Sequence, residues 1–173
     1  MSLKVLITGA SGLLGRAIFN ELTVNTDWNI VGLAYSRVGP NLKKIDLCNS
    51  KEVEEFLLEF RPDVVVHSAA ERRPDVVENQ EEKTKQLNVT STETIAKVVS
   101  QLNAFMLYIS TDYVFDGKHP PYAPNAQTNP LNKYGQSKLD GEIVARQICN
   151  AGVLRVPILY GPIEYIKESA VTG

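Results

Sequence analysis

The chain has 173 residues, of which 43% are hydrophobic and 22% charged, and its formal net charge is −2. This length suits one domain with a sizeable buried core, and we expect residues 1–173 to form a single domain. The charge balance gives no electrostatic reason to expect a nucleic acid or an anionic membrane as a partner. Cys48 and Cys149 lack metal-site spacing, and the sequence shows neither a signal peptide nor an apolar run near the roughly 20 residues of a membrane span. We therefore expect a cytoplasmic protein with reduced thiols and no metal site.

Short apolar runs alternate with longer amphipathic stretches, which is the pattern of βαβ units and a parallel sheet. Ser50 is the expected N-cap of a helix that has Glu52 in its first turn. Residues 112–129 are rich in proline, glycine and asparagine, which predicts a surface loop. In chain order the expected elements are strand Leu3–Thr8, helix Leu13–Leu22, strand Asn29–Tyr35, a short strand Leu42–Asp46, helix Ser50–Phe60, a strand centred on Val64–Val66, helix Glu81–Leu102, strand Phe105–Ser110, helix Asn132–Cys149 and strand Val153–Val156.

A glycine-rich turn separates the first expected strand from the first helix, and its glycines have the spacing G-x-x-G-x-x-G. Gly9 would allow the tight turn, Gly12 would let a pyrophosphate approach the backbone, and Gly15 would let helix and strand pack closely. Because the motif lies between a strand and a helix, it predicts a Rossmann-type fold, a doubly wound parallel sheet in three α/β/α layers. The amides expected to point outward at the helix N-terminus and hold an anion are those of Ser11, Gly12, Leu13 and Leu14.

The end of the second expected strand indicates which dinucleotide is bound. An NAD-binding domain usually has Asp or Glu there to accept hydrogen bonds from the ribose 2′-hydroxyl, whereas this chain has Tyr35, Ser36 and Arg37. Ser36 can donate to a 2′-phosphate, and the planar guanidinium of Arg37 can pair with it. These residues favour NADP, and the alternative is that Arg37 is an ordinary exposed arginine. Asp46 and Leu47 follow the third strand, where an acid and an apolar neighbour could contact adenine.

A second motif, Tyr134-x-x-x-Lys138, falls on the last expected helix. Residues four apart share one helix face, so we expect the ammonium of Lys138 to lower the pKa of the Tyr134 phenol and make it a usable proton donor or acceptor. Lys138 can also bond the nicotinamide ribose. Thr111 follows the fifth strand, at the edge where ligands bind in open α/β sheets, and its hydroxyl could orient a carbonyl. Thr111, Tyr134 and Lys138 are the candidate catalytic residues.

Over its whole length the chain resembles the extended short-chain dehydrogenases/reductases. Residues 110–117 (STDYVFDG) and 130–135 (PLNKYG) are similar to the dTDP-4-dehydrorhamnose reductase branch of that family. Residues 67–80 (HSAAERRPDVVENQ) and 157–161 (PILYG) resemble a narrower family, the regulatory beta subunits of methionine adenosyltransferase. Glu71–Gln80 is the specific part of this likeness, because nothing about a Rossmann fold demands such a stretch. The narrower resemblance implies NADP binding in the service of a partner enzyme that makes S-adenosylmethionine, with no established reductase role.

The resemblance also implies a set of cofactor contacts. Ser68, Ala69 and Ala70 end the fourth strand beside the glycine loop, where small side chains would let a ribose approach. Arg72 could reach a phosphate, but Arg72 and Arg73 could equally pair with Glu71 or Asp75. Asn88 lies within the long helix, where such enzymes use an asparagine to hold a water near the lysine, and a surface polar residue is the alternative. The implied contacts are Ser11, Gly12, Leu13, Leu14, Tyr35, Ser36, Arg37, Asp46, Leu47, Ser68, Arg72, Tyr134, Lys138 and Leu159.

The sequence leaves three functions open. The leading hypothesis is an NADP-binding regulatory subunit that forms a hetero-oligomer with the methionine adenosyltransferase catalytic subunit. The second is an NADPH-dependent reductase of a 4-keto sugar nucleotide, in which Tyr134 protonates the carbonyl oxygen while Thr111 holds it. The third is a redox sensor whose NADP occupancy tunes its affinity for a partner. The family resemblance also implies a second, substrate-binding lobe, and a chain ending at Ser169–Gly173 would lack most of it.

Overall fold

The computed structural model describes residues 2–164, and the stretch Ser169–Gly173 lies outside them. Within the described residues, the strands form one sheet in the order β3-β2-β1-β4-β5-β6, and every neighbouring pair is parallel. The order reverses between β1 and β4, which confirms the expected doubly wound sheet of the Rossmann type. The strands are β1 Lys4–Thr8, β2 Asn29–Ala34, β3 Leu42–Lys44, β4 Val64–His67, β5 Phe105–Thr111 and β6 Ala151–Val156.

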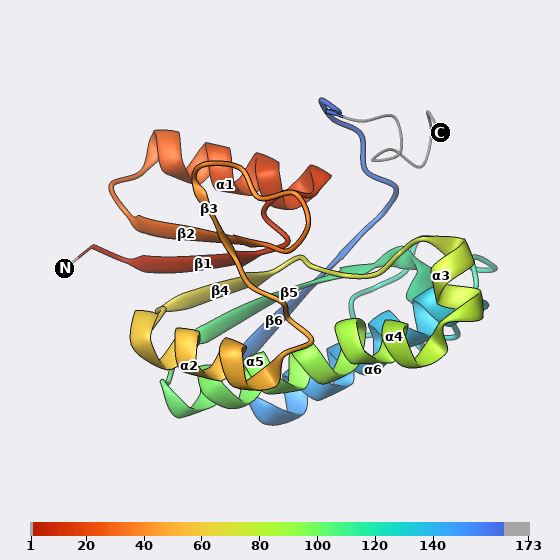
Figure 1. Ribbon diagram of the computed structural model, residues 1–173. Helices are drawn as coiled ribbons and strands as arrows, with labels where there is room; N and C mark the ends of the chain where they lie inside the picture. Colours follow the sequence, from red (N-terminus) through yellow and green to blue (C-terminus); the bar gives the residue numbers. More distant parts are fainter. Residues whose placement is uncertain (1, 165–173) are drawn as a thin grey trace.

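Helices cover both faces of this sheet, which gives the expected three layers. Figure 1 shows α1 on one face and α2, α5 and α6 on the other. Because both of its faces are covered, the central strand β1 is apolar at consecutive positions, and its residues 5–7 are fully buried. The helices are α1 Leu13–Asn25, α2 Ser50–Phe60, α3 Pro74–Asn79, α4 Glu81–Lys85, the π-helical turn η1 Gln86–Thr90, α5 Ser91–Gln101, the 3-10 turn η2 Asp112–Val114 and α6 Lys133–Ile148.

Several local expectations are corrected. Ser50 is not the N-cap of α2: the side chain of Asn49, one residue earlier, accepts the hydrogen bond from the Glu52 amide at 3.3 Å, and Ser50 already lies within the helix. The expected helix Glu81–Leu102 is helical over nearly its whole length, but η1 interrupts it with a wider turn. The short helix α3 was not expected, because six residues are too few to show helical periodicity. Strand β6 begins at Ala151, two residues earlier than expected.

All strands point the same way, so the loops that follow them meet at one edge of the sheet, which we call the carboxyl edge (Figure 1). The glycine loop follows β1 there, residues 35–37 follow β2, and residues 68–73 follow β4. Thr111 is the last residue of β5, and α6 begins with its first turn near the same edge, packed against residues 112–114. The fold therefore gathers most of the predicted site residues at one edge, although they come from distant parts of the chain.

Candidate functional site

The glycine loop has the conformation that the motif predicts. Gly9 has φ +66°, and a Cβ there would lie 2.9 Å from the backbone nitrogen of Ala69, so only glycine lets these two segments approach. A Cβ on Gly15 would press on the carbonyl of Gly9 and come within 2.9 Å of the Ser68 hydroxyl. Gly12 is the N-cap of α1, and among residues 2–164 no side chain makes a capping hydrogen bond to the first-turn amides of this helix.

One of the four expected anion-binding amides is already used. The amide of Gly12 donates to the carbonyl of Gly9 at 2.9 Å and thereby closes the turn. Leu13 and Leu14 lie in the first turn of α1, where helix geometry gives backbone N–H groups no acceptor within the helix. The expectation of an outward-pointing amide is therefore wrong for Gly12, whereas Leu13 and Leu14 remain predictions, as does Ser11 just before the helix.

The end of β4 is tied directly to the glycine loop. The Ser68 hydroxyl donates to the carbonyl of Thr8 at 2.6 Å, and the amide of Ala69 donates to the Thr8 hydroxyl at 3.2 Å. These bonds place Ser68, Ala69 and Ala70 beside Gly9, as the sequence predicts. Their small side chains are half-buried, which leaves the backbone at this position close to any ligand lying on the loop.

The residues that would choose the dinucleotide are exposed beyond β2. Tyr35 is 60% exposed, and Ser36 and Arg37 are also exposed. Asp46 lies alongside the end of β2, because the amide of residue 45 donates to the carbonyl of residue 34, the last residue of that strand. One carboxylate oxygen of Asp46 accepts from the amide of Cys48 at 2.9 Å. Leu47 packs into the core and is almost wholly buried, so little of it is available to an adenine ring.

The three candidate catalytic residues lie on adjoining elements. Tyr134 and Lys138 are one turn apart on α6, and the Tyr134 ring meets Tyr113 edge-on with 6.0 Å between centroids. Lys138 is only 2% exposed, and its ammonium nitrogen lies 4.1 Å from the centroid of the Tyr108 ring. The Thr111 hydroxyl donates to Asp112 and accepts from the amide of Tyr113, both at 3.2 Å, so it is engaged in capping η2.

The expected pKa shift of Tyr134 is wrong in sign. Burial raises the pKa of the Tyr134 phenol, and Tyr113 and Asp112 add to the rise, while the charge of Arg72 opposes it. Burial also lowers the pKa of Lys138 to about 7, against the opposing charge of Glu142. Near neutral pH the lysine is therefore only partly charged and the phenol stays protonated. The expectation rested on the charge of Lys138 alone, whereas desolvation of the buried phenol is the larger effect here.

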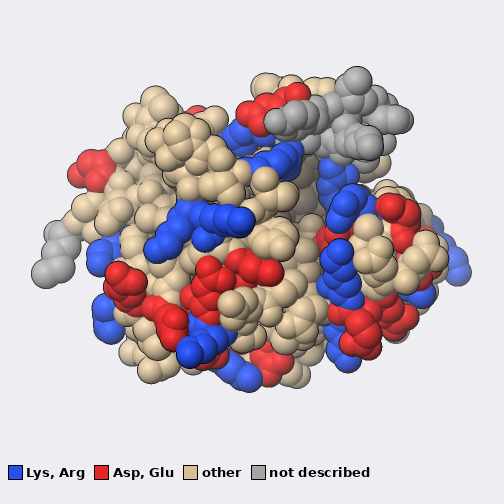
Figure 2. Space-filling model, in the orientation of Figure 1, with Lys and Arg blue, Asp and Glu red and all other residues tan. Residues whose placement is uncertain are grey.

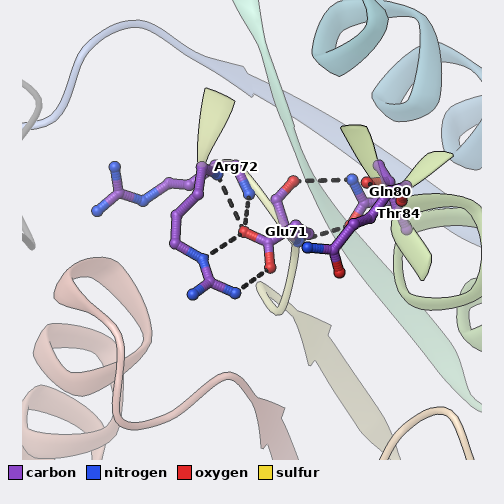
Figure 3. Close-up of polar contacts among 6 residues, drawn as sticks. Glu71, Arg72, Gln80 and Thr84 are labelled. Carbon is purple, nitrogen blue, oxygen red and sulfur yellow. Dashed lines mark hydrogen bonds and ion pairs between the residues drawn. The ribbon is translucent and has the colours of Figure 1, made fainter. Parts of the chain in front are cut away.

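The structure shows which of the two arginines, Arg72 or Arg73, pairs with the Glu71 carboxylate through its side chain. Figure 3 shows the Glu71 carboxylate held by one arginine side chain while the Arg72 side chain extends away from it. Arg73 is that partner, with its Nε 2.9 Å and a terminal nitrogen 2.6 Å from the carboxylate oxygens. Glu71 is 7% exposed, and the amides of Arg72 and Arg73 also donate to its carboxylate, each at 3.0 Å.

Asn88 is not a surface residue. It is 1% exposed, lies in η1, and accepts from the Glu71 amide at 2.7 Å. Its side-chain nitrogen donates to the Glu71 carbonyl and to the Ser137 hydroxyl, both at 2.9 Å. Both side-chain N–H groups are thereby used, so the side chain has no donor left to hold a water near Lys138.

Sequence reasoning missed several residues around Lys138. Glu142, eight residues after Tyr134, shares the helix face of Tyr134 and Lys138, a spacing that could have identified it. It is 2% exposed and makes a two-pronged ion pair with Arg155 on β6, at 2.9 and 2.7 Å. His67 and Tyr108 are also fully buried, and their rings contact each other with 5.7 Å between centroids. Nothing in their spacing along the sequence predicts this contact.

The segment after β6 returns to the start of α1. The Arg16 side chain donates to the carbonyl of Pro162 at 3.0 Å and forms an ion pair with Glu164 at 3.1 Å. Leu159, predicted to contact the cofactor, is half-buried in this segment.

Figure 2 shows basic side chains on both sides of the recess between the α1 region and the α3 region, although the whole chain is slightly acidic. Among residues 2–164 there is no cluster of acidic, histidine and cysteine side chains that could hold a metal, and no helix long and apolar enough to cross a membrane.

Comparison with known proteins agrees with this geometry. Methionine adenosyltransferase 2 subunit beta of Bos taurus is 49% identical over 98% of this chain and 51% of its own length, and that of Danio rerio is 51% identical over 98% and 52%. A crystal structure of dTDP-4-dehydrorhamnose reductase from Bacillus anthracis in complex with NADP superposes with a TM-score of 0.84, at 29% identity, over 95% of this chain and 57% of that one. The chain thus spans about half the length of the curated relatives it matches.

Both expected resemblances, to the reductases and to the beta subunits, are confirmed by these relatives. The family model described as RmlD substrate binding domain matches residues 3–170, nearly the whole chain. The chain therefore belongs to the RmlD substrate binding domain family.

Proposed function

We propose that residues 1–173 form the NADP-binding domain of a regulatory beta subunit of methionine adenosyltransferase, which assembles with the catalytic subunit to support S-adenosylmethionine synthesis. The observation that carries this proposal is the identity of about 49% with methionine adenosyltransferase 2 subunit beta over 98% of the chain. The solved dTDP-4-dehydrorhamnose reductase with bound NADP supports the choice of ligand, since it has the same fold over 95% of the chain.

The residues at the carboxyl edge suit NADP. The first turn of α1, which no side chain among residues 2–164 caps, offers amides to a pyrophosphate, and the absence of side chains at Gly9 and Gly15 lets β4 and α1 pack closely against the loop. Ser36 and Arg37 supply a hydroxyl and a guanidinium for the 2′-phosphate, with no carboxylate among residues 35–37 to repel it. Tyr134 and Lys138 lie on α6, which begins at the same edge, and would bond the nicotinamide ribose. When bound, NADPH would supply a hydride.

Calorimetric titration with NADP and with NAD tests the ligand. We expect Arg37→Ala to weaken NADP binding by about 1.5–3 kcal/mol, the range for hydrogen bonds to charged groups, and to leave NAD binding almost unchanged. Lys97→Ala is the matched control, because it removes one exposed positive charge on α5 without touching the carboxyl edge. Equal losses for the two dinucleotides would contradict the assignment of Arg37.

The partner requires a separate experiment. We expect the full-length protein to co-elute with a methionine adenosyltransferase catalytic subunit and to change the rate of S-adenosylmethionine formation. If the protein binds NADP but neither co-elutes with the catalytic subunit nor changes the rate of S-adenosylmethionine formation, the regulatory role is rejected and the NADP assignment stands.

A reductase is the second candidate, because Tyr134 remains protonated near neutral pH and a protonated phenol can donate to a carbonyl oxygen. This reading predicts NADPH oxidation when dTDP-4-dehydrorhamnose is added, abolished in Tyr134→Phe. Unchanged NADPH absorbance would reject it.

A further inference from the structure

A line of buried polar groups runs beneath the carboxyl edge, and it begins at the glycine loop. Thr8 immediately precedes Gly9, and its hydroxyl accepts from the Ala69 amide at 3.2 Å. The same hydroxyl lies 2.7 Å from one ring nitrogen of His67, and the other ring nitrogen lies 3.0 Å from the Thr92 hydroxyl on α5. The side chains of Thr8, His67 and Thr92 have no exposed surface, so their polar atoms depend on one another for hydrogen bonds. The end of β1 is thereby joined to α5 across β4.

The line continues from α5 to α6 through the π-helical turn η1. The Thr92 hydroxyl donates to the carbonyl of Asn88 at 2.9 Å, and the Asn88 side chain donates to the Ser137 hydroxyl at 2.9 Å. The Ser137 hydroxyl donates in turn to the carbonyl of Tyr134 at 2.8 Å. Helix α6 lies directly against η1, since a Cβ on Gly141 would lie 2.9 Å from the Asn88 carbonyl oxygen. Buried hydrogen bonds therefore connect the residue before the glycine loop to the turn of α6 that carries Tyr134.

Two threonines on α5 differ in whether they belong to this line. The side chains that form it, which we call the buried polar network, are those of Thr8, His67, Thr92, Asn88 and Ser137. Thr92 and Thr94 are both buried, and both donate to the backbone carbonyl four residues earlier. Thr94 otherwise donates to the Ser50 hydroxyl on α2 at 3.1 Å, whereas Thr92 contacts His67. Thr94 is therefore a matched position outside the buried polar network.

We propose that Thr92 is a positioning residue, whose hydroxyl joins the two halves of the buried polar network and so holds the Tyr134 turn of α6 in a fixed position relative to the glycine loop. This inference rests on the proposed NADP site, in which the glycine loop would hold the pyrophosphate and Tyr134 and Lys138 the nicotinamide ribose. A dinucleotide that spans both ends gains affinity when they are already correctly placed, because less ordering remains to be done on binding. A ligand that reaches only one end gains nothing from this alignment.

Substitutions at Thr92 and a comparison of whole and half ligands test the proposal. Thr92→Val removes the hydroxyl and keeps the shape of the side chain, whereas Thr92→Ser keeps the hydroxyl and removes a methyl group. Dissociation constants are measured for NADP and for adenosine 2′,5′-bisphosphate, which has the adenosine half and the 2′-phosphate but no nicotinamide ribose, with each variant shown to be folded. We expect Thr92→Val to weaken NADP about 10-fold and the bisphosphate less than about 2-fold, with Thr92→Ser and the control Thr94→Val close to wild type for both.

Several results of these titrations would overturn the proposal. They are an unchanged NADP affinity in Thr92→Val, equal weakening of the two ligands, an equal effect of Thr94→Val, and a Thr92→Ser variant that is no better than Thr92→Val. Each of them is what a general structural role, or no role, predicts for this hydroxyl.

A measurement without ligand separates this proposal from the NADP site itself. Hydrogen exchange is followed at one backbone amide near each end of the network: Ala69, which donates to Thr8, and Lys138, which helix geometry directs to the Tyr134 carbonyl. We expect Thr92→Val to speed exchange at both amides and Thr94→Val at neither, with exchange in β2 unchanged. If this difference is seen but wild type binds no NADP, the proposed function fails and the link between the two ends stands. If NADP binds and the two valine variants exchange alike, the link fails and the NADP site stands.

Discussion

His67 offers the sharpest test of the buried polar network beneath the site. It has no exposed surface, and its two ring nitrogens lie 2.7 Å from the Thr8 hydroxyl and 3.0 Å from the Thr92 hydroxyl. The Thr92 hydroxyl donates to the carbonyl of Asn88, so it accepts from the Nε2–H of His67. The Thr8 hydroxyl, which accepts from the Ala69 amide, then donates to Nδ1. With a neutral imidazole, both ring nitrogens of His67 and the hydroxyls of Thr8 and Thr92 all have hydrogen-bond partners, as a buried polar network requires.

Protonating His67 should therefore destabilise the fold. Burial, followed by the charge of Lys138, lowers the pKa of His67 from 6.5 to about 3. Below pH 6.5 the unfolded chain takes up a proton that the folded chain does not, so stability present above that pH is lost as the pH falls toward 3. The linkage relation gives a loss of about 1.5 kcal/mol at pH 5.5 and about 3 kcal/mol at pH 4.5.

Urea unfolding from pH 7 to pH 4.5 measures this loss. Wild type should lose about 3 kcal/mol more than His67→Asn over that range, because asparagine can still accept from the Thr8 hydroxyl and does not titrate. The only other histidine, His119, is exposed and gives a second ring signal in NMR, while the His67 ring should stay unchanged between pH 8 and pH 5. Parallel stability curves for the two proteins, or a His67 ring that titrates near pH 6, would refute the reasoning.

Three further changes probe the packing around the site, each read out by urea unfolding. Gly15→Ala should cost about 1–3 kcal/mol, because its Cβ would press on the Gly9 backbone, whereas Gly39→Ala, whose Cβ meets no atom of the described residues within 4 Å, should be nearly neutral. Arg155→Met should cost about 3–5 kcal/mol by leaving the buried Glu142 carboxylate unpaired, and adding Glu142→Gln should recover part of that loss; a double variant less stable than the single one would be inconsistent with this. Ser110→Ala should preserve or raise stability, because the buried Ser110 hydroxyl has no partner among the described residues; a loss above about 1 kcal/mol would show that it has one.

Local patterns predicted most of the fold. The glycine spacing between the first strand and the first helix indicated the Rossmann-type sheet, because the tight turn, the close backbone approach and the strand–helix transition are all short-range requirements. The strands were found because buried parallel strands are short, continuous apolar runs. Helix α3 and the N-cap at Asn49 were missed, because a six-residue helix has too little periodicity and a cap is decided by backbone angles at one residue.

What the sequence alone determined is the order of the strands and long helices and the set of polar residues that gather at the carboxyl edge, since both follow from periodicity, glycine spacing and the direction of parallel strands. Only the tertiary structure decided which arginine pairs with Glu71, where the Asn88 amide is used, and which way the pKa of Tyr134 moves. Those outcomes depend on burial and on hydrogen bonds between residues far apart in the chain. Desolvation is set by everything packed around a group, and no spacing within the sequence records it.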